Sequence, residues 1–321
     1  MSGVIERISA IGIMPVITKI ESVADCDALS KALIAGGIPA MEITFRMEHA
    51  DQYIRCAREN HPEMLVGAGT VITMEQAKLA IEAGAQFIVA PGLNTEIVKY
   101  CLSRGVDMIP GVATPSEVEA AMNLGLKTVK FFPAEQNGGI AAIKAICGPY
   151  SGVGFIPTGG LGLNNIADYF AFDRIVACGG TYMLGAHMAK REWAEITELC
   201  RKSVQTMLNL RLAHVGINTE NEATARETAS GIAGLLRMDV AKDGSSSVFV
   251  DRAIEVMKSN YLGSHGHIGF YTSSVDRAVR YYKAMGVEFN EASAKYAANG
   301  KLNAIYFKDE IGGFAIHLVN A

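Results

Sequence analysis

Short apolar, β-branched runs alternate with amphipathic helical stretches through most of this sequence. Between Ile13 and Leu184 such runs recur roughly every 20 to 27 residues, at 13–17, 40–45, 65–71, 87–91, 107–112, 128–133, 154–158 and 174–178. Parallel strands are buried on both faces and therefore read as nearly continuous apolar runs. Eight β-α units predict a closed TIM (β/α)8 barrel. A doubly wound open sheet is the alternative, but the Gly-rich turn that usually follows its first strand is missing.

The sixth run, 128–133, carries a lysine in its middle. If Val129 and Phe131 pack against helices, Lys130 points the other way, into the space that the strands enclose. Burial of an ammonium group is costly unless it is paired, so a chain rarely retains one without a use. As the free amine, such a lysine can attack a carbonyl and form a Schiff base. The alternative is a lysine on an edge strand with its charge in water.

Polar residues and glycines follow the other runs at their C-terminal ends, where active sites of such barrels lie. Glu42, Thr44 and Arg46 share one face of the second run. Paired glycines follow the last two runs, at Gly159-Gly160 and Gly179-Gly180. Glycine lets a phosphate approach backbone N–H groups closely, so the two pairs together predict an anion site. Either pair alone would fit an ordinary tight turn.

Six blocks of sequence together resemble the class I 2-keto-3-deoxy-6-phosphogluconate (KDPG) aldolases, a family that includes 2-keto-4-hydroxyglutarate (KHG) aldolases. The blocks follow the family's order over about the first 200 residues and lie at Glu42–Arg46, Val66–Thr70, Ala90–Gly92, Ile109–Gly111, Lys130–Glu135 and Pro157–Gly160. Met47 and Thr181 depart from the family, which often has threonine and serine at these positions. The departure at Met47 leaves the substrate preference open.

The resemblance implies a role for each residue of the site. Lys130 would form the Schiff base, and Glu42 would transfer protons through a bound water. The other expected substrate contacts are Arg46, Thr70 and Thr158 near the pyruvyl carboxylate, Pro91 at the pocket wall, and Gly159, Gly160, Gly179, Gly180 and Thr181 at the distal phosphate. The chemistry agrees, because cleavage beside a ketone needs an electron sink and a base. A simple ion pair with Lys130 or Arg46 is the alternative role for Glu42.

The resemblance also implies an activity and an assembly. The enzyme would be an aldehyde-lyase that cleaves KDPG to pyruvate and glyceraldehyde 3-phosphate, without a cofactor and as a homotrimer. The alternative substrate is 4-hydroxy-2-oxoglutarate, which would give pyruvate and glyoxylate. Its distal carboxylate would use the same glycine-lined anion pocket.

The sequence changes character after a helix expected at 192–210. A segment at 213–219 is repeated 53 residues later at 266–272, and each copy is followed by a helical stretch and strand-like runs. We therefore expect a barrel domain over 1–210 and a smaller α+β domain of two βαβββ units over 211–321. By weaker motifs, this second domain resembles the vicinal oxygen chelate (glyoxalase-like) superfamily.

In that superfamily, metal ligands come from the first and last strand of each unit. The corresponding residues here are His214, Glu255, His267 and His317. Three imidazoles and a carboxylate suit zinc, nickel, manganese or iron. In the alternative, the domain is only a binding or assembly module, and its histidines are merely hydrogen-bonded. His265 is assigned to the loop before its strand.

Charge and hydropathy exclude several classes of partner. The net charge is −4 and the pI is about 6.0, without long charged runs, which argues against a nucleic-acid surface or a polybasic membrane anchor. No apolar stretch is long enough to span a bilayer, and the N-terminus lacks a signal-peptide pattern. We therefore expect a cytoplasmic enzyme whose partner is a small phosphorylated 2-oxo acid.

Overall fold

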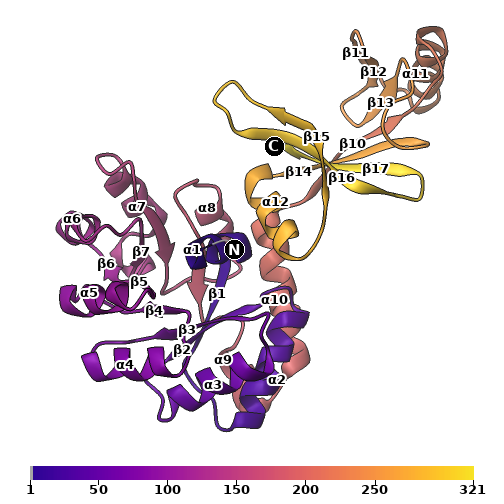
Figure 1. Cartoon of the computed structure of the whole chain (residues 1–321). Helices are drawn as coiled ribbons and strands as arrows, with labels where there is room; N and C mark the ends of the chain where they lie inside the picture. Colours follow the sequence, from indigo (N-terminus) through magenta and orange to yellow (C-terminus); the bar gives the residue numbers. More distant parts are fainter. Residues whose placement is uncertain (1–2) are drawn as a thin grey trace. The chain divides into compact units, whose positions relative to one another are not determined.

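A computed structural model of the chain describes residues 3–321 (Figure 1). These residues form two compact units, the first ending at Met207 and the second spanning Leu208–Ala321. Each unit has its own sheets and its own buried residues. Within residues 3–321, no helix combines the length and the apolar character that membrane crossing requires.

The first unit is built on parallel strands. Six of them form one curled sheet in the order β5-β4-β3-β2-β1-β9, and three form a second sheet in the order β6-β7-β8. Their bounds are β1 Ile13–Ile17, β2 Ala40–Thr44, β3 Leu65–Gly69, β4 Phe87–Val89, β5 Asp107–Ile109, β6 Gly111–Val112, β7 Thr128–Phe131, β8 Gly154–Pro157 and β9 Cys178–Gly180. Parallel bridges join Phe155 to Ile175 and Thr158 to Gly179. The unit is a curled parallel α/β sheet, and full closure into the expected (β/α)8 barrel stays a prediction.

One predicted strand is interrupted in the structure. The run at 107–112 is divided at Pro110 into β5 and β6. Proline has no N–H group to donate to a neighbouring strand, so it breaks the ladder on that side. The carbonyl of Pro110 still accepts a hydrogen bond from Lys130 N, at 2.9 Å. This bond connects the interrupted strand to β7.

The strand predicted at 174–178 is wrong in position, because β9 begins only at Cys178. The preceding residues enter a turn, in which Ile175 N donates to Phe172 O at 3.0 Å. A turn of this kind removes the backbone from a continuous ladder, and Ile175 forms only an isolated bridge. Apolar composition alone predicted the run, and composition does not distinguish a buried turn from a buried strand.

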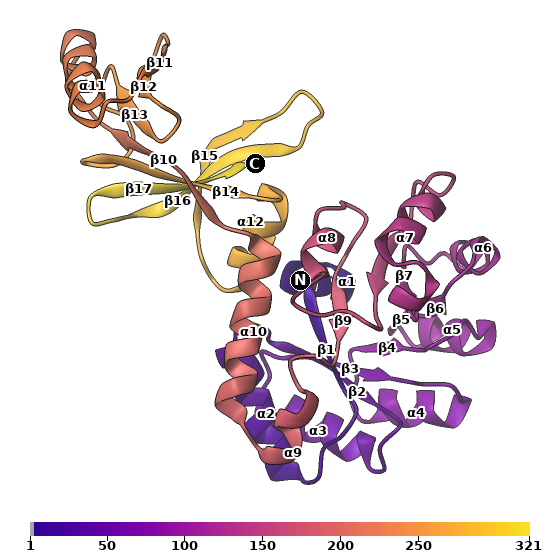
Figure 2. The ribbon, with the colours of Figure 1, turned by 180° about the vertical axis from the view of Figure 1, so that it is seen from behind.

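Helices lie on the outside of the strands in both views (Figures 1 and 2). Thr73 and Thr114 each begin a helix with a capping box, in which the cap side chain and the residue three positions on exchange hydrogen bonds with the backbone. Phe131 and Phe155 pack edge to face, with ring centroids 6.4 Å apart. This packing buries one face of β7, so the alternate residue Lys130 lies on the other face. The helices are α1 Val4–Ile11, α2 Val23–Ala35, α3 Ala50–Asn60, α4 Met74–Glu82, α5 Thr95–Ser103, α6 Pro115–Asn123, α7 Gly139–Cys147, α8 Ile166–Phe170, α9 Gly185–Lys190 and α10 Trp193–Leu208.

The second unit runs twice through the order strand, helix, strand, strand, strand. The first copy comprises β10 Arg211–Ile217, α11 Glu222–Leu236, β11 Val240–Asp243, β12 Ser247–Val250 and β13 Ile254–Met257. The second comprises β14 Gly266–Thr272, α12 Val275–Ala284, β15 Phe289–Tyr296, β16 Leu302–Ile311 and β17 Phe314–Asn320. All eight strands form one sheet in the order β11-β12-β13-β10-β14-β17-β16-β15. The first strands of the two copies pair antiparallel at its centre, and each is parallel to the last strand of its own copy.

Candidate functional site

Lys130 lies on β7 with only 6% of its surface exposed. Its neighbours Val129 and Phe131 are fully buried on the opposite face of the strand. Lys130 Nζ is 3.4 Å from Oε1 of Glu42, which lies on β2 and is 3% exposed. The two groups come from positions 88 residues apart, and the curled sheet brings them together. A buried amine beside a buried carboxylate is the pairing that proton transfer at a Schiff base requires.

Space for the Glu42 side chain is created by a glycine on the next strand. A Cβ atom placed on Gly69 of β3 would lie 2.2 Å from Glu42 Oε1. Since β2 and β3 pair with Thr44 opposite Gly69, any larger residue at this position would push the carboxylate away from Lys130. Sequence reasoning missed this function of Gly69, although the residue lies in one of the family blocks.

A cavity of about 300 Å³ opens beside Lys130. Nine of the eleven residues expected at the aldolase site line it, namely Lys130, Arg46, Thr70, Pro91, Thr158, Gly159, Gly160, Gly180 and Thr181. The other two expected residues adjoin lining residues. Glu42 Oε1 is 3.4 Å from Lys130 Nζ, and a Cβ on Gly179 would lie 2.4 Å from Thr158 Oγ1. Sequence reasoning missed the apolar lining residues Val16, Phe132 and Leu161, because an apolar side chain carries no chemical signal.

Two features of the cavity wall suit it to a polar ligand. Thr70 has a φ of 55°, a left-handed conformation that is uncommon for a threonine and that clusters at functional sites. Thr158 Oγ1 is buried and has no hydrogen-bond partner within residues 3–321. A buried hydroxyl without a partner is costly, and a ligand oxygen in the cavity would satisfy it.

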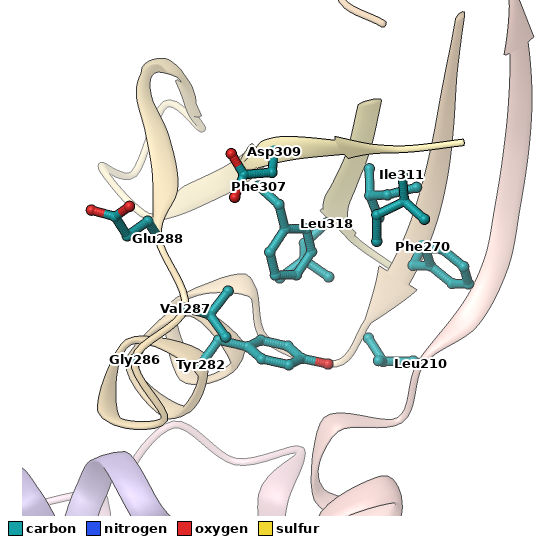
Figure 3. A pocket seen from close by; sticks show the side chains of 11 residues that line it. Leu210, Phe270, Tyr282, Gly286, Val287, Glu288, Phe307, Asp309, Ile311 and Leu318 are labelled. Carbon is teal, nitrogen blue, oxygen red and sulfur yellow. The ribbon is translucent and has the colours of Figure 1, made fainter. Parts of the chain in front are cut away.

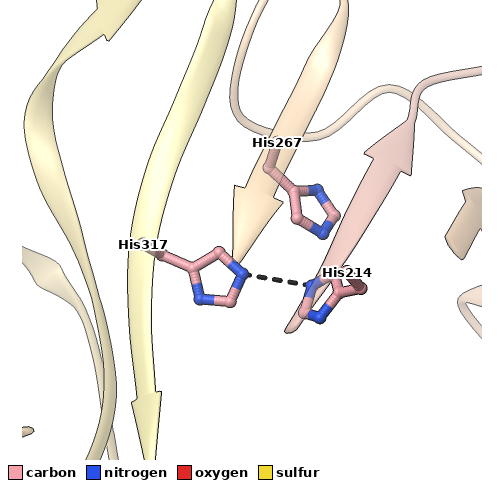
Figure 4. A group of neighbouring side chains, drawn as sticks. All are labelled: His214, His267 and His317. Atoms are coloured by element: carbon pink, nitrogen blue, oxygen red, sulfur yellow. Dashed lines mark hydrogen bonds between the residues drawn. The ribbon is translucent and has the colours of Figure 1, made fainter. Parts of the chain in front are cut away.

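A second group of side chains lies on the sheet of the C-terminal unit (Figure 4). His214, His267 and His317 each offer one ring nitrogen, and these atoms lie within 4.8 Å of one another. His214 Nε2 and His317 Nε2 are 3.1 Å apart. Glu255 Oε2 is 3.1 Å from His267 Nε2 and 3.5 Å from His214 Nε2. The structure thus brings together the four residues that correspond to the superfamily's ligand positions, and His265 lies in an exposed position.

Glycines on β10 and β14 make room for these rings. A Cβ on Gly216 would lie 2.1 Å from the His267 ring, and a Cβ on Gly269 would lie 2.6 Å from His317 Nε2. Gly216 faces His267 and Gly269 faces His214 across the central strand pair. The in-phase repeat therefore supplies both the imidazoles and the space between them.

Burial favours the neutral form of two histidines in this cluster, His214 and His317. It lowers the pKa of His317 to about 3, with further lowering from His214 and His267. Burial also lowers the pKa of His214. Burial raises the pKa of the Glu255 carboxyl, but hydrogen bonds from His267 and Ser247 outweigh this effect and lower the pKa below its ordinary value. For His214, His317 and Glu255, the neutral imidazole and the ionised carboxylate are the forms that bind a divalent cation.

The same cluster lines a cavity of about 400 Å³. Its floor includes Tyr306, whose ring stacks on His317 with centroids 4.6 Å apart. Among the lining residues that the structure describes, Lys295 carries the only positive charge and Glu255 the only carboxylate. Lys295 lies on β15, a strand that sequence reasoning did not find.

A third cavity, of about 510 Å³, lies on the opposite face of the same sheet (Figure 3). Phe270, Ile316 and Leu318 line it, and side-chain alternation places them opposite His267 and His317. Helix α12 has 10 residues whereas α11 has 15, so the second copy covers less of its sheet than the first. Among the residues that the structure describes, those lining this cavity are mainly aliphatic and aromatic, with the carboxylates of Glu288 and Asp309 and no cluster of metal-ligating side chains.

Comparisons with known proteins match the first unit to one enzyme family. The model of the family "KDPG and KHG aldolase" matches residues 4–199. The 2-dehydro-3-deoxy-phosphogluconate aldolase of Treponema pallidum is 45% identical over 206 residues, which cover 64% of this chain and 98% of that protein. The KHG/KDPG aldolase of Escherichia coli is 40% identical over 194 residues, covering 60% and 91%.

A solved aldolase structure also aligns with the first unit. The KDPG aldolase of Legionella pneumophila, with pyruvate captured as a covalent carbinolamine, aligns with a TM-score of 0.60 and 35% identity. The alignment covers 62% of this chain and 97% of that one. The family match ends at residue 199 and does not extend into the C-terminal unit.

Proposed function

This chain belongs to the KDPG and KHG aldolase family, and we propose that its first unit cleaves KDPG through a Schiff base on Lys130. The protein is an aldehyde-lyase of the class I type, in which the lysine itself supplies the electron sink and no cofactor is needed. The observation that carries the proposal is the buried pair of Lys130 Nζ and Glu42 Oε1, 3.4 Å apart, beside a cavity lined by the residues expected to hold substrate.

The residues divide the reaction between them. Lys130 Nζ attacks the C2 carbonyl of the 2-oxo acid, and loss of water leaves a protonated Schiff base. Glu42 then takes the proton of the C4 hydroxyl as the C3–C4 bond breaks, and the electron pair moves into the Schiff base to give an enamine. The C4 fragment leaves as glyceraldehyde 3-phosphate. The proton held by Glu42 then returns to C3 of the enamine, and water hydrolyses the Schiff base to release pyruvate and regenerate the amine. The cavity supplies Arg46 for the carboxylate and Gly159, Gly160 and Gly180 for the phosphate.

Replacement of Arg46 by alanine should weaken substrate binding more than catalysis. The guanidinium lines the cavity and is suited to hold the carboxylate of the 2-oxo acid in two hydrogen bonds. We expect a KM for KDPG about 10 to 100 times higher, the loss expected for a hydrogen bond to a charged group. Steady-state kinetics would measure it, with the exposed Arg104 replaced by alanine as a control. An unchanged KM would remove Arg46 from the substrate site.

A second candidate substrate is 4-hydroxy-2-oxoglutarate, which would give pyruvate and glyoxylate. The name of the E. coli relative includes this activity, and the distal carboxylate would occupy the anion pocket in place of the phosphate. Parallel steady-state rates on the two substrates distinguish them. A clear preference for the unphosphorylated substrate would make it the main activity.

Two architectural features belong to the same proposal. The bridges between Phe155 and Ile175 and between Thr158 and Gly179 support closure of the sheet into an eight-stranded barrel over 1–210. A homotrimer is expected from the family resemblance, and the mass of the purified protein in solution would test it.

For residues 211–321 the proposal is a glyoxalase-like metal-binding domain. The support is local: three ring nitrogens within 4.8 Å, an ionised carboxylate beside them, and two glycines whose absent side chains leave space for the rings. His214, His267, His317 and Glu255 would hold the ion, and zinc, nickel, manganese or iron would suit them. Such an ion would act as a Lewis acid toward a ligand in the adjoining cavity. The alternative is a binding or assembly module without metal.

Metal analysis of the purified full chain should find about one divalent ion per chain. Replacement of His267 by alanine should remove most of it, because this residue is 2% exposed and contacts Glu255. Replacement of His265, an exposed histidine two positions earlier, should leave the metal content unchanged. A chelator should leave the rate of KDPG cleavage unchanged. Absence of stoichiometric metal would favour the binding or assembly module.

A further inference from the structure

The turn Gly159-Gly160 after β8 is held in place from outside the aldolase cavity. Ala134 N donates to Thr158 O at 2.8 Å, and Glu135 N donates to Gly159 O at 3.1 Å. Neither donor lines the cavity. Because these carbonyl oxygens accept hydrogen bonds from groups outside the cavity, they do not repel an anion within it. The wall of the cavity therefore suits a phosphate.

The turn is also packed tightly against the segment that supplies these donors. Gly159 and Gly160 have φ values of 101° and 80°, which favour glycine. A Cβ on Gly160 would lie 2.6 Å from Glu135 Cγ, and a Cβ on Gly159 would lie 3.2 Å from Pro133 Cα. Both the backbone conformation and the close packing therefore require glycine, and the turn has little freedom on this side.

The third carbonyl of the turn is held by a side chain. Asn165 Nδ2 donates to Gly160 O at 3.1 Å, and Asn165 Oδ1 accepts from Gly162 N at 2.9 Å. Asn165 is the residue at the N-cap of α8, where an asparagine usually accepts a hydrogen bond from the helix backbone. Here its side chain makes no such bond. Both of its polar atoms are used to close the loop instead.

We propose that Asn165 is a positioning residue for phosphate recognition. It does not line the cavity, and it acts by holding Gly160 and Gly162 so that the Gly159-Gly160 turn keeps its carbonyls outward. This inference rests on the proposed phosphate site at the two glycine pairs. Three hydrogen bonds hold the carbonyls of Thr158, Gly159 and Gly160. Backbone N–H groups donate the first two, so only the bond from Asn165 to Gly160 O can be removed by a side-chain substitution.

The test compares KDPG with 2-keto-3-deoxygluconate, which has the same carbon chain without the phosphate. Asn165→Ala should raise the KM for KDPG about tenfold, the effect of weakening roughly one hydrogen bond to a charged group. The kcat for KDPG and the kcat/KM for the unphosphorylated compound should change less than about twofold, because Lys130 and Glu42 are not altered. Asn164→Ala, at the exposed neighbouring asparagine, should leave both substrates unaffected.

A second variant keeps the test informative if Asn165→Ala folds poorly. Asn165→Ser retains a residue that caps helices well, but its short hydroxyl cannot reach both Gly160 O and Gly162 N. It should show the same selective loss toward KDPG. Equal loss on both substrates, or an unchanged KM for KDPG in folded variants, would overturn the role of Asn165. If the unaltered protein itself shows no preference for KDPG over its unphosphorylated analogue, the phosphate site is wrong, and the role of Asn165 falls with it.

Discussion

Replacement of Lys130 by alanine should reduce KDPG cleavage by at least about 10³-fold, the scale on which loss of a covalent nucleophile acts. Lys130 is 6% exposed and lines the glycine-lined cavity, and its amine is 3.4 Å from Glu42 Oε1. Without it no Schiff base forms, so the electron pair of the breaking C3–C4 bond has no acceptor. Glu42 alone would remain, and a base without an electron sink does not cleave the bond.

Lys127→Ala is the matched control for this variant. Lys127 is exposed and precedes β7 by one residue, so its loss should leave cleavage unchanged. Thermal unfolding of both variants would separate loss of chemistry from loss of fold. Removal of the Lys130 amine leaves the buried Glu42 side chain without its hydrogen-bond partner, so some destabilisation of Lys130→Ala is expected. Substantial activity in a folded Lys130→Ala protein would mean that another lysine is the nucleophile.

Glu42→Gln should lower kcat by about 10² to 10⁴-fold, the usual contribution of a general acid–base group. The side chain is 3% exposed and fits against Gly69, so the isosteric amide should occupy the same space. Because glutamine cannot take the C4 hydroxyl proton, bond cleavage is slowed while the lysine remains in place. Pyruvate should still be trapped on the enzyme by borohydride after long incubation.

The distinction between the two variants is the informative result. Lys130→Ala is expected to lose both cleavage and trapping, whereas Glu42→Gln is expected to lose cleavage and retain trapping. Glu48→Gln, at an exposed carboxylate on the loop after β2, should behave as the unaltered protein. A normal kcat in Glu42→Gln would assign the proton transfer to another group and leave Glu42 as a structural partner of Lys130.

The alternation of side chains along strands predicted the placement of several site residues correctly. It placed Lys130 opposite Val129 and Phe131, and the structure buries those two residues on the other face. The same rule placed His214 and His267 in phase within the repeat, and their rings meet in the structure. These inferences succeed because each depends on local geometry that every β-strand shares.

Strands without apolar alternation could not be found in this way. All four residues of β11 are exposed, and β15 carries polar residues at half of its positions without strict alternation, so neither gave a periodic signal. Pairing with neighbouring strands creates them, and this information is not local to the segment. The shift of β9 has the same origin, because a turn at Ile175 depends on tertiary packing.

The residues that hold the site in shape were also beyond sequence reasoning. Gly69 matters because of where Glu42 reaches, and Asn165 matters because of where the Gly160 carbonyl points. Each role is a contact between segments whose geometry the sequence pattern does not contain. Catalytic residues are recognisable from their chemistry, whereas positioning residues become visible only in three dimensions.

The most direct test of the central claim is to treat the full-length protein with pyruvate and borohydride and to locate the adduct by peptide mass spectrometry. We expect one reduced adduct, on the peptide that contains Lys130, because this buried residue lines the cavity. An adduct on a different lysine, or no adduct in a folded protein that cleaves KDPG, would contradict it.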